Sequence, residues 1–272
     1  MISIVTGATS GIGYHTACGL AKKKHNLILA SRNIHKLNLV KKEIENKYST
    51  TCDVYEHDLS LISENINFYK EVSKKYKNIN FLINNVGAIF MRREETTEGL
   101  EKTFSLNHMS YFVLSKLFLQ QECPLSIINV SSEAHRNIKL DYEDLENKNN
   151  YNGWYSYKKS KLSNIYFTHE CNKRLIHTKS TVNCLHPGVV NTNFANDNAL
   201  PYKIVASLIK YFGITPREGA ETILYLVNNN IKSASGLYFK KCKPIKSSQV
   251  SYDKELSEKL WDYSEQILSQ YI

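Results

Sequence analysis

A short apolar strand near the start of the chain, residues 2–5, leads directly into a turn that contains three glycines. The turn reads Thr6-Gly7-Ala8-Thr9-Ser10-Gly11-Ile12-Gly13 and opens a helix-like segment. Glycine is needed where the backbone bends sharply and where it touches a phosphate, and a helix N-terminus adds free amides and the positive end of a dipole. The turn therefore predicts a site for the pyrophosphate of a dinucleotide. The alternative is a glycine-rich turn that holds no ligand.

The rest of the chain alternates between strand-like and helix-like segments. Strands are expected at residues 2–5, 26–30, 52–58, 79–83, 126–130, 180–185 and 236–239, and helices at 12–24, 34–47, 62–76, 98–121, 154–176, 217–229 and 252–270. This order predicts right-handed βαβ units and a parallel sheet, with ligands at the carboxyl ends of the strands. No linker or repeat interrupts the 272 residues. We therefore expect a single α/β domain, residues 1–272, with a doubly wound, seven-stranded parallel sheet and helices on both faces.

The charge of +9 raises the question of an anionic partner. The lysines are spread along the chain without interleaved aromatic residues, which favours solvated helix faces over a nucleic-acid or membrane site. No run of 18 apolar residues and no signal-peptide pattern occurs, so we expect a cytoplasmic protein with at most peripheral membrane contact. The six cysteines and nine histidines match no zinc or redox motif, so reduced thiols and no metal site are expected.

The glycine spacing resembles that of the short-chain dehydrogenase/reductase superfamily, whose signature is TGxxxGxG. The resemblance implies a Rossmann-type fold and a nicotinamide dinucleotide held by Gly7, Thr9, Ser10, Gly11, Ile12 and Gly13.

The end of the second strand indicates which dinucleotide is bound. NAD sites usually carry an acid here for the ribose 2′-hydroxyl, whereas this chain has Ser31 and Arg32. An arginine binds a phosphate through two hydrogen bonds, so the sequence predicts NADP(H) as the cofactor. The alternative is a solvated arginine without a ligand.

Two further strand ends match the family. The Asp58-Leu59 pair would contact the adenine, or Asp58 would cap the next helix. The run Asn84-Asn85-Val86-Gly87 is similar to the family's Asn-Asn-Ala-Gly turn, with valine in place of alanine. Asn85, Val86 and Gly87 are therefore expected in the ribose pocket.

Tyr157 and Lys161 are four residues apart on a predicted helix and so share one face. A lysine cation near a phenol lowers the pKa of the phenol and makes it a usable general acid or base. A second pair, Tyr155 and Lys159, has the same spacing, but two residues rotate a helix by about 200°, so both pairs cannot face one site. The family pattern Tyr-x-x-Ser-Lys fits only Tyr157 and Lys161.

The remaining site residues follow from the resemblance. The family uses the second serine of the Ser131-Ser132 pair to hold the substrate oxygen, which leaves Ser131 to support the backbone. Asn107 would steady Lys161 through water. After the sixth strand, Pro187 and Gly188 would cover the nicotinamide.

Val190 and Thr192 complete this predicted cofactor contact, and Thr192 would hold the carboxamide. Residues 191–215 have no clear period and would form a substrate lid. Apolar residues in this segment predict a lipophilic substrate, or else they simply pack on the core or dock on a membrane.

Residues 215–222 and 259–265 look like the retinol-dehydrogenase-like branch, which includes the oxidoreductase domain of the WW-domain oxidoreductase. The expected activity is NADP(H)-dependent hydride transfer at a small-molecule carbonyl or alcohol, with reduction of a lipophilic aldehyde or ketone favoured. The alternative is an NADP(H)-binding sensor with little turnover. Relatives are often dimers through the helices that carry Asn107 and Tyr157, so a homodimer is also an open expectation.

Overall fold

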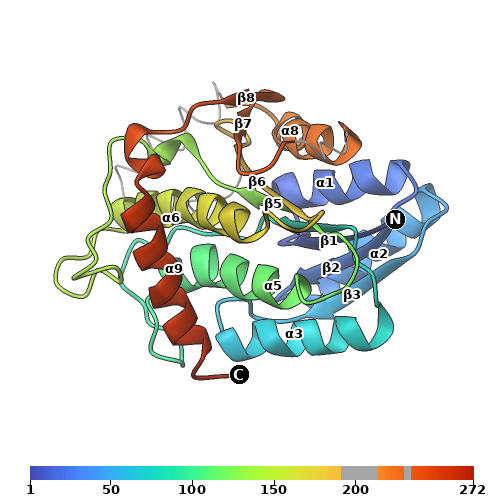
Figure 1. The fold of residues 1–272 in the computed structure, drawn as a ribbon. Coiled ribbons are helices and arrows are strands. Elements are labelled where there is room, and N and C mark those ends of the chain that lie inside the picture. The colour runs from blue at the N-terminus through green and yellow to red at the C-terminus, as the bar shows by residue number, and fades with distance from the viewer. Residues whose placement is uncertain (191–212, 230–233) are drawn as a thin grey trace.

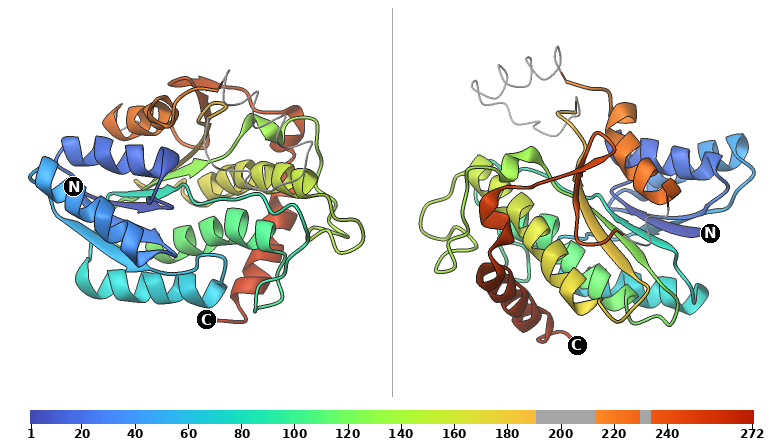
Figure 2. Two further views of the ribbon diagram at one scale, coloured as in Figure 1. Left: turned by 180° about the vertical axis from the view of Figure 1, so that it is seen from behind. Right: turned by 45° about the horizontal axis from the view of Figure 1, so that its top comes forward.

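The computed structural model describes residues 1–190, 213–229 and 234–272. The strands form one sheet in the order β3-β2-β1-β4-β5-β6-β7-β8, with helices on both faces (Figures 1 and 2). The single α/β unit and its parallel sheet are as predicted. The parallel strands are β1 (Ile2–Thr6), β2 (Asn26–Ser31), β3 (Cys52–Glu56), β4 (Phe81–Asn84), β5 (Ser126–Val130), β6 (Thr181–His186) and β7 (Tyr238–Lys240).

The sheet has an eighth strand, β8 (Lys243–Ile245), which the sequence did not predict. It pairs antiparallel with β7 at the edge of the sheet. Lys241 and Cys242 join the two strands with φ values of 50° and 59°. Two consecutive positive φ values give the turn that suits a tight hairpin, but such a turn normally contains Gly or Asn. The turn was missed because Lys and Cys carry no such signal.

Two helical layers enclose the sheet and create two separate apolar cores. One layer contains α1 (Gly11–Lys22), α2 (Ile34–Lys47) and α8 (Pro216–Asn229). The other contains α3 (Ile62–Lys75), α5 (Ser110–Phe118), α6 (Gly153–Arg174) and α9 (Lys254–Leu268). The helices between the parallel strands return the chain to the start of the next strand, so the carboxyl ends of these strands meet at one edge of the sheet.

The long helix predicted at 98–121 is broken into three parts. A short turn, α4 (Lys102–Phe104), leads into a π-helix, η1 (Ser105–Met109), which continues as α5. The carboxylate of Glu101 accepts hydrogen bonds from the amides of Thr103 and Phe104 and starts the helix. A π-turn has no sequence signature and often marks a functional site. Here it contains Asn107.

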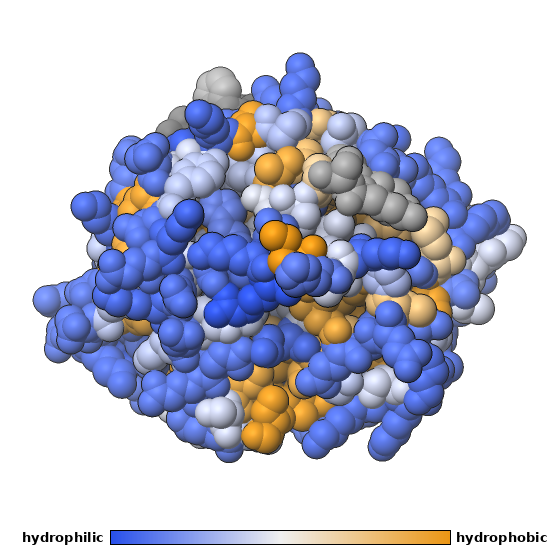
Figure 3. Space-filling view, viewed as in Figure 1, coloured by the Kyte–Doolittle hydropathy of each residue, from blue (hydrophilic) through white to orange (hydrophobic). Residues whose placement is uncertain are grey.

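The last helix, α9, crosses α5 and α6 on the outside of the molecule (Figure 1). Its Trp261 ring lies 5.0 Å from Phe112 of α5 and 5.9 Å from Phe167 of α6, between ring centroids. The opposite side of α9 is polar, and hydrophilic residues predominate on this face of the molecule (Figure 3). The amphipathic helix therefore seals the apolar outer sides of α5 and α6.

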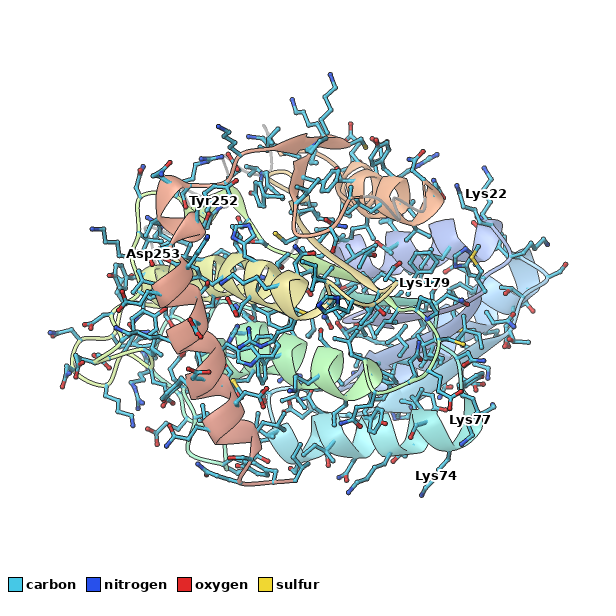
Figure 4. All side chains as sticks on the ribbon, in the orientation of Figure 1. Lys22, Lys74, Lys77, Lys179, Tyr252 and Asp253 are labelled. Carbon is cyan, nitrogen blue, oxygen red and sulfur yellow. The ribbon has the colours of Figure 1, made fainter. Side chains whose placement is uncertain are left out.

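Many basic residues lie where helices end. The last turns of four helices carry Lys22 (α1), Lys47 (α2), Lys74 and Lys75 (α3), and Lys173 and Arg174 (α6). Figure 4 shows Lys22, Lys74, Lys77 and Lys179 at the edge where the parallel strands begin. Cations stabilise helix C-termini through the helix dipole, which accounts for part of the basic composition. Among the described residues, no helix combines the length and apolarity needed to cross a bilayer.

Candidate active site

The glycine turn between β1 and α1 has the geometry of a phosphate site. Gly7 and Gly11 have φ values of 68° and 58°, which favour glycine. A Cβ at Gly13 would lie 2.3 Å from the carbonyl oxygen of Gly7, so no other residue fits there. The N-cap of α1, Ser10, makes no side-chain capping hydrogen bond. The first amides of α1 are therefore left for an anion, and the turn fits a pyrophosphate.

Residues that follow β4 hold this turn in place. The hydroxyl oxygen of Thr6 accepts from the amides of Asn85 (2.9 Å) and Val86 (3.0 Å). The side chain of Asn85 donates to the carbonyl of Thr6 at 2.9 Å and to that of Gly7 at 3.3 Å. Asn85 therefore shapes the pyrophosphate turn as well as lying beside the predicted ribose pocket.

A hollow of about 310 Å³ opens beside the turn, between α1 and α2. It is lined by Thr9, Ser10, Tyr14, Lys36, Leu39, Val40 and Glu43. Arg32 is exposed at the end of β2, and Asn33 caps α2 by accepting from the amide of Lys36 at 2.9 Å. Lys36 therefore places a positive charge at this hollow. On the other side of α1, Ile12 packs on the core.

Asp58 does not cap the following helix, which was one of its two predicted roles. Its carboxylate accepts from the amide (3.0 Å) and hydroxyl (2.7 Å) of Ser60. Helix α3 begins at Ile62 and is capped by Glu98, which accepts from the amides of Ile62 (2.5 Å) and Ser63 (3.0 Å). The cap comes from a residue distant in sequence, which local spacing could not reveal. Leu59 is buried.

Ser132, Tyr157 and Lys161 come together at the carboxyl end of β5. Ser132 and Tyr157 share a side-chain hydrogen bond. The Nζ atom of Lys161 lies 5.5 Å from the centre of the Tyr157 ring and donates to the carbonyl of Val130 at 3.1 Å. A Cβ at Gly87 would lie 3.4 Å from this Nζ atom. The predicted catalytic groups therefore adjoin the turn that follows β4 (residues 85–88, called the β4 turn below), which supports the glycine turn.

Burial dominates the electrostatics of this pair. It raises the pKa of Tyr157 to about 12, while the hydrogen bond with Ser132 acts in the opposite direction. Burial also lowers the pKa of Lys161 to about 7. The expected lowering of the Tyr157 pKa by Lys161 is therefore absent from this structure, because desolvation disfavours both charged forms. A lysine with a pKa near 7 can still accept or release a proton at neutral pH.

Asn107 uses its side chain to join three segments. Its Oδ1 accepts from the amide of Ala88, and its Nδ2 donates to the carbonyl of Ala88, both at 2.9 Å. The same Nδ2 donates to the hydroxyl of Ser160 at 3.0 Å. Asn107 therefore fixes the β4 turn to the helix that carries Tyr157 and Lys161.

The competing tyrosine and serine lie elsewhere. Tyr155 is 43% exposed, and Lys159 donates to the carbonyl of Asp144 (2.6 Å) and the side chain of Asn147 (2.9 Å). This pair therefore faces the loop before α6. The hydroxyl of Ser131 donates to the main-chain carbonyl of Lys161 at 2.7 Å, as expected of a residue that supports the backbone.

The segment after β6 is described only as far as residue 190. Gly188 has a φ of 108°, and a Cβ there would lie 2.3 Å from Ile214. Val190 forms an isolated parallel bridge with Ile214. Pro187 follows β6 directly. Thr192 and most of the lid expected at 191–215 lie outside the described residues.

Two aromatic residues that the sequence analysis did not select also contact the site. Trp154 stacks on Tyr157, with ring centroids 5.6 Å apart and an angle of 26° between the planes. Tyr111 donates to the carbonyl of Val86 at 2.9 Å, and the Nζ of Lys161 lies 5.7 Å from its ring centre. Helical spacing would have found both, because Trp154 precedes Tyr157 by three residues and Tyr111 follows Asn107 by four.

Several known proteins are similar to this chain in sequence. The family model described as short chain dehydrogenase matches residues 1–202. Retinol dehydrogenase 14 of Mus musculus is 31% identical over 280 residues, with 96% of this chain and 84% of the relative covered. Retinol dehydrogenase 12 of Homo sapiens is 32% identical over 273 residues, with 98% and 86% covered.

Solved structures agree with the sequence relatives. A Mycobacterium paratuberculosis protein has a TM-score of 0.79 at 26% identity, with 98% of this chain and 93% of that chain covered. A Burkholderia cenocepacia short chain dehydrogenase in complex with NADP has the same fold, with a TM-score of 0.69, 19% identity, and 87% and 94% covered. The chain belongs to the short-chain dehydrogenase/reductase family, in its retinol-dehydrogenase-like branch, and is an oxidoreductase that binds a nicotinamide cofactor.

Proposed function

We propose that this protein transfers hydride between NADP(H) and a small-molecule carbonyl or alcohol, and that its main reaction is the reduction of a lipophilic aldehyde or ketone. The observation that carries this proposal is the group formed by Ser132, Tyr157 and Lys161 at the carboxyl end of β5. This group adjoins the turns that fit a dinucleotide. This arrangement supports the proposal, because carbonyl reduction requires a cofactor site and a proton donor close together.

The nicotinamide supplies the hydride when it is bound. Tyr157 donates a proton to the carbonyl oxygen as negative charge develops there, and its pKa of about 12 keeps it protonated at neutral pH. Ser132 donates a hydrogen bond to the same oxygen and orients it. Lys161 binds the ribose and, with a pKa near 7, can return a proton to Tyr157 after the reaction. Asn107 keeps α6 in register with the β4 turn.

The choice of NADP(H) over NAD(H) rests on the end of β2. Arg32 is exposed there next to Ser31, and no carboxylate occupies either position. A charge-assisted hydrogen bond from Arg32 to the 2′-phosphate would contribute about 1.5–3 kcal/mol. Lys36 lines the hollow between α1 and α2 and adds a second positive charge on this side of the glycine turn.

Apolar surface near Tyr157 supports a lipophilic substrate. Trp154 stacks on Tyr157 and is 46% exposed, and Val189 is 57% exposed just after the turn at Pro187. The exposed ring of Trp154 beside the reacting group would bind a hydrocarbon chain. The relatives named retinol dehydrogenases take their name from an alcohol with a long apolar chain. We propose that the segment at 191–215 closes over such a substrate as a lid.

The remaining expectations concern where the protein works and with what. We expect a cytoplasmic protein with at most peripheral membrane contact and no nucleic-acid partner. The lysines at helix C-termini support the last of these expectations, because those charges have a structural role without a nucleic-acid partner.

The proposal is tested by following NADPH oxidation with aliphatic, aromatic, retinoid and steroid carbonyls. We expect turnover of the lipophilic carbonyls with NADPH and much slower turnover with NADH. Tight NADPH binding without turnover of any carbonyl or alcohol would instead favour a sensor. Absence of NADPH binding would overturn the proposal altogether.

A further inference from the structure

The peptide bond that joins Ser132 to Glu133 is held on both sides by histidine rings. The carbonyl oxygen of Ser132 bonds to Nδ1 of His135 at 2.6 Å. The amide of Glu133 donates to Nδ1 of His186 at 3.2 Å. These two atoms are the only polar atoms of that peptide unit, so each of them has a histidine-ring partner, and the carbonyl also accepts from the main-chain amide of His135 at 3.2 Å. We propose that His135 and His186 are positioning residues that aim the Ser132 hydroxyl at the substrate oxygen, an inference that rests on the proposed function.

The hydrogen-bond partners fix the protonation of His135. The amide of Ser248 donates to Nε2 of His135 at 3.0 Å. An amide N–H can only donate, so Nε2 is the unprotonated nitrogen and Nδ1 carries the proton. That proton then points at the carbonyl of Ser132, which can only accept. His135 therefore links the catalytic strand end to the segment before η3 (Gln249–Tyr252).

His186 must have the opposite tautomer. Its Nδ1 accepts from the amide of Glu133, so the proton is on Nε2. His186 is the last residue of β6, and its ring therefore joins β6 to the end of β5. A histidine with a proton on both nitrogens could not accept this bond.

Burial keeps both rings neutral. His135 is 0% exposed and His186 is 5% exposed. Burial lowers the pKa of His135, and it lowers the pKa of His186 to about 4. Each histidine can therefore act near pH 7 as one donor and one acceptor with fixed direction. Neither ring is needed to transfer a proton in the reaction.

The peptide orientation matters because it sets the position of the Ser132 side chain. Ser132 begins a short 3-10 turn, η2 (Glu133–His135), and its Oγ accepts from the amide of Ala134 at 3.2 Å. If the peptide rotated, η2 would move with it and the amide of Ala134 would no longer hold the Oγ atom, which would then turn away from Tyr157 and from the substrate oxygen. Misplacement of a reacting group by about 1 Å can lower the rate 10²-fold.

The same loop has a separate anchor, which provides a control. The Glu133 carboxylate accepts from Tyr238 (2.9 Å), Lys240 (3.0 Å) and Arg136 (3.2 Å). Replacing Lys240 with methionine removes part of this anchor but leaves both bonds to the peptide unit. A loss of activity caused by general loosening of the loop would then appear in Lys240→Met too.

The test compares His186→Leu, which cannot accept the bond, with His186→Asn, whose side-chain oxygen can. We expect His186→Leu to lower kcat by ~10- to 100-fold with NADPH affinity changed less than about threefold. His186→Asn should recover most of kcat, and Lys240→Met should stay near the parent. If His186→Leu keeps full kcat, or if His186→Asn is no better than His186→Leu, the inference fails. Should His186→Leu not fold, His135→Phe replaces it, because it keeps the packing on Tyr238.

A second measurement does not depend on turnover. Nitrogen NMR of labelled histidine in the parent should show His135 protonated at Nδ1 and His186 at Nε2, with assignments from the variants. The opposite tautomers, or rapid exchange between tautomers, would overturn the positioning role. If the tautomers are as stated but the parent reduces no carbonyl, the proposed function fails, while the two histidine contacts with the Ser132–Glu133 peptide still stand.

Discussion

Asn107 and Ser160 are joined by a hydrogen bond from the side-chain amide to the hydroxyl oxygen, 3.0 Å long. Ser160 in turn donates to the main-chain carbonyl of Tyr157 at 2.7 Å. The π-turn that carries Asn107 is thus fixed to α6 one residue before Lys161. This contact gives the serine of the Tyr-x-x-Ser-Lys pattern a physical role, because it sets the rotation of α6 that turns Tyr157 inward and Tyr155 outward.

Replacing Tyr157 with phenylalanine should abolish most of the activity. The ring and its stacking on Trp154 are kept, but no acid remains for the developing alkoxide. General acid catalysis contributes about 10²- to 10⁴-fold, so kcat should fall by a factor in that range. NADPH affinity should change little, because Lys161 is proposed to hold the ribose. Steady-state turnover and NADPH fluorescence measure the two effects.

Tyr155→Phe is the matched control, since Tyr155 is exposed on the other side of α6. It should keep kcat within a few-fold of the parent. The assignment of the proton donor is wrong if Tyr155→Phe is the inactive variant, and the catalytic proposal is wrong if neither variant loses activity.

Arg32→Ala should weaken NADPH binding and leave NADH binding nearly unchanged. Arg32 is exposed at the end of β2, and a guanidinium there is proposed to bind the 2′-phosphate, which NADH lacks. A loss of about 1.5–3 kcal/mol corresponds to a Kd increase of roughly 10- to 150-fold. Titration calorimetry with both cofactors would measure it.

Lys42→Ala tests whether any nearby cation has this effect. Lys42 is exposed on α2 but does not line the hollow. It should leave both affinities unchanged. An equal loss of NADPH and NADH affinity in Arg32→Ala would mean that Arg32 supports the fold and does not bind the phosphate.

The strands and most helices could be predicted because their signals are local. Apolar runs such as residues 126–130 mark buried strands, and the glycine turn after Thr6 marks its own conformation. The β7–β8 hairpin was missed because Lys241 and Cys242 adopt positive φ without a favourable residue. The helix predicted at 98–121 was wrong in detail because a π-turn depends on packing and leaves no period in the sequence.

In the site, too, local motifs were predictable and features that depend on the packing of distant segments were not. Motif spacing selected Ser132, Tyr157 and Lys161, which lie together in the structure, but it could not give the pKa values of Tyr157 and Lys161, since burial by the whole fold decides those. The contacts of His135 and His186 with one peptide bond also escaped prediction. The His186 contact joins residues 53 positions apart, and the orientation of the His135 ring depends on Ser248 in a third segment.

Trp154→Ala should reduce the preference for long apolar substrates. In the parent, kcat/KM should rise with carbonyl chain length, by up to about fourfold for each methylene that is fully buried at ~0.8 kcal/mol. Removing the exposed ring next to Tyr157 should flatten this increase. Turnover of an aldehyde series gives the slope. Tyr155→Ala should keep the parent's slope, and efficient turnover of small charged keto acids by the parent would contradict a lipophilic substrate.

The cost of burying Lys161 should show in the pH dependence of stability. Its pKa is lowered from 10.5 to about 7 in the folded protein, so the unfolded chain binds more protons between these pH values. Stability therefore rises with pH in this window, and the penalty is fully present below about pH 7. Relative to Lys161→Met, the cofactor-free parent should gain ~1–3 kcal/mol in free energy of unfolding between pH 6.5 and 9.5.

Urea unfolding of both proteins at the two pH values measures this difference. The lost hydrogen bond to Val130 affects the offset between the proteins but not its slope with pH. Lys42→Met, at an exposed site, should show a constant offset from the parent. If the difference in free energy of unfolding between the parent and Lys161→Met is also constant with pH, Lys161 stays charged and solvated in the folded protein.

Helix α9 should keep the protein monomeric. A homodimer through α5 and α6 would need the surface that α9 covers, where Trp261 packs between Phe112 and Phe167. The outer side of α9 is polar and offers no equivalent apolar surface. Trp261→Ala should lower the free energy of unfolding by about 3–5 kcal/mol and promote association through the loosened face. Light scattering after size exclusion measures both proteins. A parent dimer that Trp261→Ala leaves intact would show that another face is used, and a dimer that this variant dissociates would show that α9 itself is the interface.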